Sequence, residues 1–295
     1  MTAISATVAA APRQTAPAAD AVMAQAAREN FPVAIKLLGR RRRSQLLSLY
    51  GFARLVDDAG DEADGDRLAL LDWIESDLDR IYAHRAPEHQ LLRVLAPTIH
   101  DLRLPAAPFR RLVEANRRDQ TVTRYESFEQ LLDYCSLSAA PVGELVLHVF
   151  GVATPDRIAL SDRICAGLQV TEHLQDVAED RARGRVYLPA QDLTRFGVTD
   201  ADLLATVPGA TFARLMAFEI GRARALLWEG APLIGRLAPP ASFAVAGFVA
   251  GGRAALDAIA RAGGDVLGAQ PRPSRASVAR SLLVTLLAHG RGSWR

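Results

Sequence analysis

The sequence has few cysteines and no long uncharged apolar run, and each scarcity excludes a class of protein. Only two cysteines occur among the 295 residues, Cys135 and Cys165, and they show neither CxxC spacing nor a disulfide framework. Such usage suits a reducing, cytoplasmic setting, where both would be small core residues. No uncharged apolar stretch reaches the roughly 18 residues of a membrane span, so no transmembrane helix is expected.

An excess of charge of one sign is also lacking. The chain has 35 Lys and Arg against 33 Asp and Glu, a formal net charge of +2, which argues against a general polyanion binder. The basic run from Arg40 to Arg43 has no interleaved aromatic residues, so we interpret it as a solvated helix start, with anionic lipid as the alternative contact. No GxGxxG or Walker-type loop is present. Neither a nucleic-acid partner nor NADPH is therefore expected.

Strand signals are scarce, whereas helix signals recur along the chain. Aromatic residues make up only 6% of the sequence, and Ala and Leu dominate the 49% that is hydrophobic, a composition that favours an all-α fold. Residues 1–21, rich in Ala, Thr and Pro, are interpreted as a disordered leader, and residues 22–295 as one α-helical domain. Helices are expected over 21–29, 41–60, 66–83, 89–101, 107–118, 127–137, 141–150, 155–181, 209–233, 240–261 and 274–289.

Two acidic clusters are the most informative feature of the sequence. The first lies in YGFARLVDDAGDE and the second in LQVTEHLQDVAED. Since each helical residue turns about 100°, Asp57 and Asp61 lie about 40° apart on one face, and so do Asp176 and Asp180. The apolar neighbours of both pairs predict that these faces turn inward, where unpaired carboxylates are costly and need cations. Two such pairs across a cavity would suit Mg²⁺ with phosphate oxygens, which indicates a diphosphate-handling enzyme.

An alternative is that both clusters are solvated helix faces of a noncatalytic scaffold. Arg54 would then pair with Asp58, and Arg181 or Arg183 with Asp180. The neighbours of the clusters favour the enzyme, because Arg185 follows the second cluster and an arginine can hold phosphate oxygens in a bidentate fork. A zinc site at His173 is not expected, since no second His or Cys lies at zinc spacing.

Five segments, in their order and spacing, resemble the squalene/phytoene synthase family of all-α class I isoprenoid synthases. They are ENFPVAIKLLGRRRR, LYGFARLVDDAGDE, TRYESFEQLLDYC, SAAPVGELVLHVFG and LQVTEHLQDVAEDRARGRVYLP. The likeness covers roughly residues 27–290. Within the family, the ENFPVA opening, the APVG turn and the QDVAED form are most similar to hydroxysqualene synthases of the bacterial hopanoid route.

This resemblance implies a single-domain isoprenoid synthase fold with a central cavity. It implies Mg²⁺-dependent conversion of presqualene diphosphate to hydroxysqualene, with water capturing the cation. The alternative within the family is head-to-head condensation of two farnesyl diphosphates to presqualene diphosphate or squalene. The expected partners are an isoprenoid diphosphate and a presqualene diphosphate synthase that hands it over. A cytoplasmic location is expected, with the C-terminal helix either in the core or resting on the membrane surface.

The resemblance also assigns the site residues. Asp57, Asp61, Glu172, Asp176 and Asp180 would bind Mg²⁺, with the four aspartates, Tyr50 and Arg54 as the catalytic set. Tyr50, Arg54, Gln169 and Arg185 would surround the diphosphate, with Tyr187 close by. Asn30 and Phe31 match a flap that closes the cavity, and Tyr134, Ala139, Val142 and Gly143 match the lining of the prenyl tunnel.

Two positions depart from the family pattern. Glu172 stands where many members have Asn, and Gln175 where many have Arg. Glutamate still offers metal-binding oxygens, so metal binding is expected to survive. The diphosphate would lose one cationic contact, which suits one ionisation rather than the two of a condensing enzyme.

Overall fold

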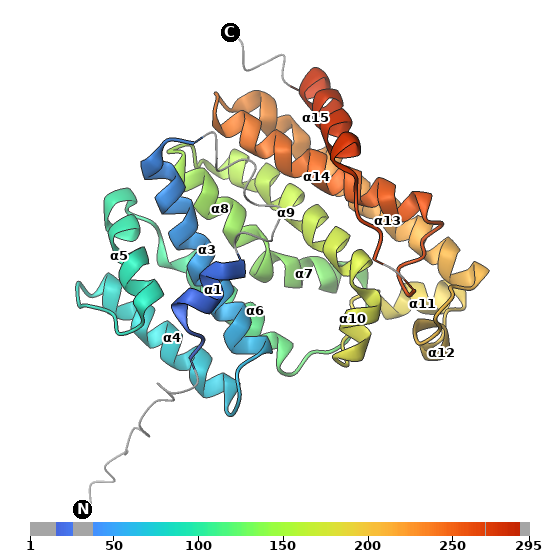
Figure 1. Cartoon of the computed structure of the whole chain (residues 1–295), viewed down its shortest axis with the longest axis horizontal. Coiled ribbons are helices and arrows are strands. Elements are labelled where there is room, and N and C mark those ends of the chain that lie inside the picture. Colours follow the sequence, from blue (N-terminus) through green and yellow to red (C-terminus); the bar gives the residue numbers. More distant parts are fainter. Residues whose placement is uncertain (1–15, 26–37, 269, 290–295) are drawn as a thin grey trace, which may run out of the picture.

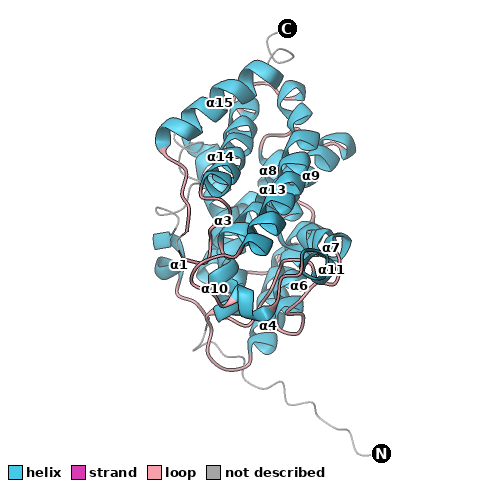
Figure 2. Cartoon of the chain, turned by 90° about the vertical axis from the view of Figure 1, so that its right-hand side faces the viewer, coloured by secondary structure: helices cyan, strands magenta, loops and turns pink. Residues whose placement is uncertain are grey.

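Helices make up all the regular structure in the part of the chain that the computed structural model describes, residues 16–25, 38–268 and 270–289 (Figures 1 and 2). β-pairing there is limited to an isolated bridge between Arg124 and Val186. The elements are α1 (Ala19–Gln25), α3 (Arg40–Asp61), α4 (Arg67–Tyr82), α5 (Gln90–Leu102), α6 (Ala106–Asp119), α7 (Phe128–Ser138), α8 (Ala140–Val149), α9 (Pro155–Gln175), α10 (Val177–Ala182), α11 (Ala190–Phe196), α12 (Asp200–Leu203), α13 (Ala210–Gly230), the 3₁₀-helix η1 (Ala231–Arg236), α14 (Ala241–Arg261) and α15 (Arg275–His289). The predicted all-α fold class is confirmed.

Local capping explains why several helices begin where the sequence predicts. The Asp66 carboxylate accepts a hydrogen bond from the Ala69 amide at 2.9 Å, and the Ser127 hydroxyl accepts one from the Gln130 amide at 3.3 Å. These side chains satisfy amides that the first turn of a helix leaves without an intrahelical partner. α4 and α7 therefore start within one residue of their predicted positions.

The prediction of one helix over residues 155–181 is wrong. α9 ends at Gln175, Asp176 has the non-helical backbone angles φ −104° and ψ 16°, and α10 begins at Val177. The Asp176 amide still donates to the Glu172 carbonyl (3.0 Å), and the Asp180 amide to the Asp176 carbonyl (2.8 Å). The chain thus changes direction at Asp176 while keeping these two hydrogen bonds, so Asp176 lies at the junction of the two helices and Asp180 lies on α10.

The predicted boundary of the leader is also wrong, because α1 begins at Ala19, inside residues 1–21. Val22 of α1 is fully buried, and His89 Nε2 lies 3.2 Å from the Pro17 carbonyl oxygen. Composition alone suggested disorder, but an alanine-rich segment forms helix readily once it has a core to contact. The rest of that prediction, residues 1–15, lies outside the described residues.

Two hydrophobic cores meet at α8. Helices α1, α3, α4, α5 and α6 form the first core, where Phe52 and Phe109 make an edge-to-face contact with ring centroids 5.1 Å apart. Helices α7, α9, α13 and α14 form most of the second core. α8 contributes Leu145 to the first core and Leu147 to the second. The first acidic cluster lies on α3, a helix of the first core, and the second cluster follows α9, a helix of the second core. The two clusters therefore meet where the cores join.

α14 is the one described helix whose length and composition would allow it to cross a membrane. Of its most apolar window, 61% is buried within the fold, and Val249, Leu256 and Ile259 belong to the second core. This burial is typical of a core helix.

We expect Gly230→Ala to destabilise the protein. A Cβ atom at Gly230 would lie 2.6 Å from the Leu160 carbonyl oxygen and 2.9 Å from the Ile164 amide nitrogen, backbone atoms of α9 that cannot rotate away. The free energy of unfolding should fall by about 1–3 kcal/mol, measured by urea unfolding. Gly221 on the same helix has no atom within 4 Å of its Cβ position, so Gly221→Ala should instead add about 0.5–1 kcal/mol. Equal effects of the two variants would contradict this packing.

Candidate functional site

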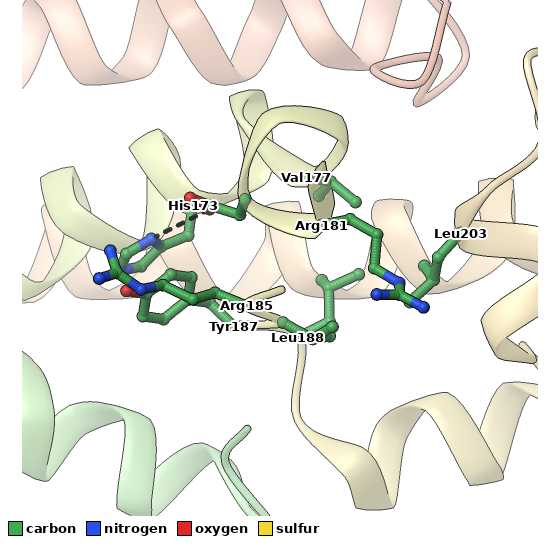
Figure 3. Close-up of a pocket in the computed structure, with 9 residues that line it drawn as sticks. His173, Val177, Arg181, Arg185, Tyr187, Leu188 and Leu203 are labelled. Atoms are coloured by element: carbon green, nitrogen blue, oxygen red, sulfur yellow. Dashed lines mark ion pairs between the residues drawn. The ribbon is translucent and has the colours of Figure 1, made fainter. Parts of the chain in front are cut away.

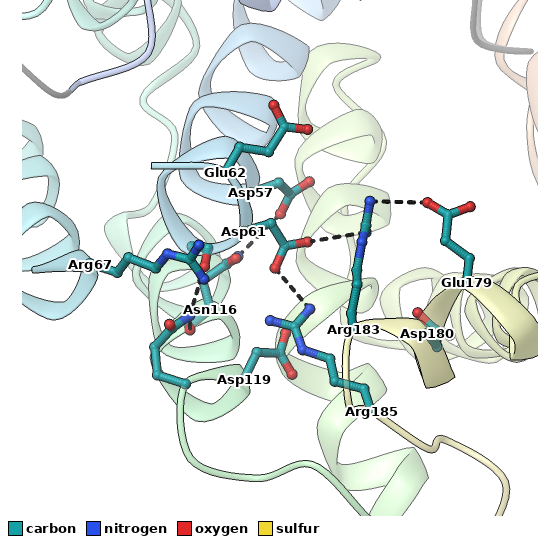
Figure 4. A network of polar contacts seen from close by, with 12 residues as sticks. Asp57, Asp61, Glu62, Arg67, Asn116, Asp119, Glu179, Asp180, Arg183 and Arg185 are labelled. Atoms are coloured by element: carbon teal, nitrogen blue, oxygen red, sulfur yellow. Dashed lines mark hydrogen bonds and ion pairs between the residues drawn. The ribbon is translucent and has the colours of Figure 1, made fainter. Parts of the chain in front are cut away.

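The two acidic clusters lie opposite one another, and arginines connect them (Figure 4). Asp61, on the last turn of α3, has its Oδ1 2.8 Å from Arg185 Nη1 and its Oδ2 3.9 Å from Arg183 Nη1. Arg183 also pairs with Glu179 of α10 at 3.0 Å. The residues that follow the second cluster thus hold a carboxylate of the first. Segments that are far apart in the sequence form one charged site.

Asp57 is a carboxylate whose environment disfavours its charge. Asn116 Nδ2 donates a hydrogen bond to Asp57 Oδ1 at 3.1 Å. Asp57 is exposed to solvent on one side, but desolvation by the protein atoms around the carboxylate raises its pKa to about 6. The Asn116 hydrogen bond and the charge of Arg54 oppose this rise, and Asp61 and Asp58 add to it. A bound cation would stabilise the ionised form of the Asp57 carboxylate.

Arg54 pairs with Asp58, the partner that the scaffold alternative predicted for it. Arg54 Nε lies 2.7 Å from Asp58 Oδ1, and Arg54 Nη2 lies 3.5 Å from Glu62 Oε1. The Asp58 side chain is only 6% exposed, so this pair is not on a solvated face. The pairing of Asp180 with Arg181 or Arg183 is not what the structure has, because Asp180 Oδ2 lies 3.7 Å from His173 Nδ1 and Arg183 turns to Glu179 and Asp61.

A pocket beside the second cluster is lined by His173, Asp180, Arg185 and Tyr187, among others (Figure 3). The rings of His173 and Tyr187 stack with centroids 3.7 Å apart and an interplanar angle of 12°. The pocket thus combines a flat aromatic wall with two arginines, Arg181 and Arg185, and one carboxylate, Asp180. The lining therefore places charged groups beside an aromatic surface.

Asp119 lies behind this wall as a buried acceptor for two phenols. Tyr134 donates to Asp119 Oδ2 at 2.5 Å and Tyr187 donates to Asp119 Oδ1 at 3.4 Å. Burial raises the pKa of Asp119 to about 6, although the Tyr134 hydrogen bond and the charge of Arg185 lower it. Asp119 fixes the direction of both hydroxyl groups.

The segment before α15 lies against the second cluster. Gln270 Nε2 donates a hydrogen bond to Asp176 Oδ1, and Gln175 Nε2 donates one to the Pro271 carbonyl at 3.2 Å. Burial raises the pKa of Asp176, and the Gln270 hydrogen bond opposes that rise. Gln270 is a contact that the sequence did not indicate, because no pattern joins it to the cluster.

Three other residues predicted to bind the diphosphate or the metal lie on α3 and α9, the helices that carry or lead into the acidic clusters. Tyr50 is half-buried on α3, and Glu172 is exposed on α9. Gln169 Nε2 is 3.3 Å from His173 Nε2. Their roles toward a ligand stay predictions.

The predicted tunnel residues divide between the two cores. Tyr134 is buried in the second core, and Val142 packs against the first. Ala139 joins α7 to α8. At Gly143 a Cβ atom would collide with the Ser161 hydroxyl of α9, so close helix packing accounts for this glycine. The predicted flap residues, Asn30 and Phe31, lie outside the described residues.

Helix α6 supplies site residues that the sequence prediction missed. Asn116 and Asp119 bond to the aspartate and tyrosines described above, and Gln120 Nε2 donates to the Gly60 carbonyl at 3.0 Å. Leu112 and Ala115 of the same helix are buried. Asn116 and Asp119 follow those two residues at a spacing of four, which was the available signal for polar side chains that face inward.

The carboxylates are suited to binding a Mg²⁺ ion that is also coordinated by phosphate oxygens. Within the described ranges, no group of three or more His, Cys, Asp or Glu stands close enough to hold an ion alone. The donors are instead two pairs of hard oxygen ligands on facing walls, and desolvation raises the pKa of one member of each pair, Asp57 and Asp176. Mg²⁺ commonly takes only one or two carboxylates and completes its shell with water and phosphate oxygens. Mg²⁺ binding itself stays a prediction.

We expect Asp57→Asn to stabilise the metal-free protein near pH 7. The folded-state pKa of about 6 lies above the unfolded value of about 4, so the stability contributed by Asp57 falls as the pH rises from about 4 to about 6. The asparagine carbonyl can still accept the Asn116 hydrogen bond. Thermal unfolding without divalent metal should show a higher midpoint for the variant near pH 7, and the gain should vanish towards pH 4. A gain that persists at pH 4 would contradict desolvation as its cause.

Comparison with known proteins finds a matching family and similar sequences. A family model described as squalene/phytoene synthase matches residues 24–280. A hydroxysqualene synthase from Rhodopseudomonas palustris is 36% identical over 209 residues, which cover 70% of this chain and 70% of that protein.

Two solved structures have similar folds. A squalene synthase HpnC from Alicyclobacillus acidocaldarius superposes with a TM-score of 0.77 at 43% identity, covering 82% of this chain and 91% of the other. A dehydrosqualene synthase in complex with a ligand gives a TM-score of 0.82 at 22% identity, covering 92% and 96%. At that identity the second likeness bears on the fold alone.

Proposed function

The chain belongs to the squalene/phytoene synthase family and has the class I isoprenoid synthase fold, and on this premise we propose that it converts presqualene diphosphate to hydroxysqualene. The similarity to a hydroxysqualene synthase over most of the chain supports this reaction among those of the family. Membership makes an isoprenoid diphosphate the expected substrate class.

The meeting of Asp61 with Arg183 and Arg185 is the observation that carries the proposal. It supplies carboxylates and guanidinium groups in one site, which is what a diphosphate with its counter-ions requires. Arg185 is only 12% exposed, so its interaction with phosphate oxygens would be weakly screened by water. In the ligand-free chain these arginines neutralise Asp61.

The two aspartate pairs would hold Mg²⁺ from opposite walls, with Glu172 as a further candidate ligand. When bound, Mg²⁺ supplies positive charge that stabilises a departing diphosphate. The fit rests on the donor set and on the desolvation of Asp57 and Asp176.

In the proposed reaction the carbon–oxygen bond to the diphosphate breaks and its electron pair leaves with the diphosphate. Arg183 and Arg185 would bind the phosphate oxygens as that charge develops. The cyclopropylcarbinyl cation rearranges with opening of the ring, and one water adds to it and loses a proton to give the alcohol. The buried rings of Tyr134, Tyr187 and His173 would limit the access of other water.

A second candidate is the head-to-head condensation of two farnesyl diphosphates, onward to squalene where NADPH takes part. It is favoured by the name of the 43% identical protein, a squalene synthase. Condensation carried onward to squalene needs two ionisations, whereas condensation to presqualene diphosphate and the proposed reaction need one each.

Purified protein with Mg²⁺ separates the candidates when it is given presqualene diphosphate or farnesyl diphosphate, with and without NADPH. Alcohol formed from presqualene diphosphate without NADPH supports the proposed function. Consumption of farnesyl diphosphate alone supports condensation. Inertness towards both substrates, without binding of inorganic diphosphate, would support a noncatalytic scaffold.

Asp57→Ala and Asp176→Ala should each lower kcat/KM by about 100-fold or more, because each removes an oxygen ligand from one wall. Asp64→Ala is a matched control, since Asp64 is exposed just beyond α3, and it should retain wild-type turnover. Steady-state diphosphate release measures both. Full activity in either site variant would remove that cluster from the mechanism.

Gln175→Arg should raise the preference for farnesyl diphosphate over presqualene diphosphate by about tenfold, by adding a charged contact to phosphate. The substitution also removes the Gln175 hydrogen bond to Pro271. Gln175→Ala controls for that loss without adding charge. An unchanged ratio of kcat/KM values in Gln175→Arg would show that this position does not set the reaction.

A further inference from the structure

Helix α15 is apolar on two sides, and only one of them is covered. Leu282 and Leu286 pack against the second core. Leu283, Val284 and Leu287 point away from it and are 60%, 45% and 62% exposed. At helical spacing these three side chains share one face. Nothing in the described part of the chain covers them.

Trp228 extends this exposed surface at the end of α15. It belongs to α13, is 58% exposed, and its ring makes an edge-to-face contact with His289 at 5.0 Å between centroids. α15 lies beside α14 at the edge of the molecule (Figure 1). We call Leu283, Val284, Leu287 and Trp228 the α15 face.

The charges around the α15 face are mostly positive. From Arg275 to His289 the sequence has two arginines and no acidic residue. Arg280 is exposed and lies one turn before Leu283 and Val284 on the same side of the helix. Glu229, next to Trp228, pairs with Arg163 at 3.8 Å. The sequence that follows α15, GRGSWR, adds two arginines and a tryptophan.

We propose that the α15 face docks on an anionic phospholipid bilayer. Exposed leucine and tryptophan side chains flanked by arginine are the residues that insert at the boundary between head groups and acyl chains. A second copy of the chain fits less well, because the charges around this face are mostly positive and two such faces would repel each other. Three aliphatic side chains and one indole also offer little area for a stable dimer.

A short segment connects the docked helix to the site. Only a few residues separate α15 from Gln270 and Pro271, which contact the second cluster. The segment that contains Gln270 and Pro271 therefore leads directly from the second cluster into the docked helix. The proposal does not depend on which isoprenoid diphosphate is turned over.

Co-sedimentation of the full chain with vesicles tests this proposal without any turnover. Vesicles of phosphatidylcholine mixed with phosphatidylglycerol should bind the protein, and vesicles of phosphatidylcholine alone should bind it more weakly. The double variant Leu283→Ser with Leu287→Ser should lose about tenfold or more in the partition coefficient. Arg280→Gln should lose about fivefold on the anionic vesicles.

The chain offers a matched control in Leu204 and Val207, which are 66% and 74% exposed and lie outside the α15 face. Leu204→Ser with Val207→Ser should bind as the wild type does. An equal loss in this control, or no binding of wild type to anionic vesicles, would overturn the proposal. So would a wild-type dimer, seen by sedimentation velocity, that the α15 variant dissociates without any change in vesicle binding. Thermal unfolding of each variant checks that its fold is intact.

Discussion

The ion pair between Asp61 and Arg185 is the contact on which the site depends. It joins the end of α3, which belongs to one hydrophobic core, to the segment after α10, which belongs to the other. Because the arginine already neutralises the carboxylate, binding of a metal and a diphosphate would be an exchange of ionic partners. Arg185 would pass from Asp61 to phosphate oxygens while cations take its place. Such an exchange keeps buried charge compensated at each stage, which limits its energetic cost.

The same site shows a conflict between stability and function. Desolvation raises the pKa of Asp57 and Asp119 to about 6 and raises that of Asp176. Keeping these groups ionised weakens the folded state, so packing elsewhere must offset them. The surrounding helices pack closely, as at Gly230, where α13 lies against the α9 backbone without room for a Cβ atom. Carboxylates whose ionised form destabilises the folded state are suited to binding a cation.

Local signals made much of the fold predictable, whereas contacts between distant segments did not. Asp66 and Ser127 cap their helices through bonds to residues three positions away, so the boundaries of α4 and α7 follow from short stretches of sequence. The change of direction at Asp176 coincides with contacts from Gln270 and Pro271, whose distance along the chain hides them. The acidic clusters and Arg185 were identifiable from family segments. Asp119 lies in none of those segments. Its role as an acceptor for Tyr134 is seen only in the structure, where α6 lies beside α7.

α8 has a consequence for how the molecule loses its structure. Its side chains enter both cores, and Phe150 at its end packs against both. Neither core can open without exposing apolar surface of the other, so the two should melt in one cooperative transition rather than as separate units. Since the aspartates and arginines meet where those cores join, no partly unfolded form would retain a working site.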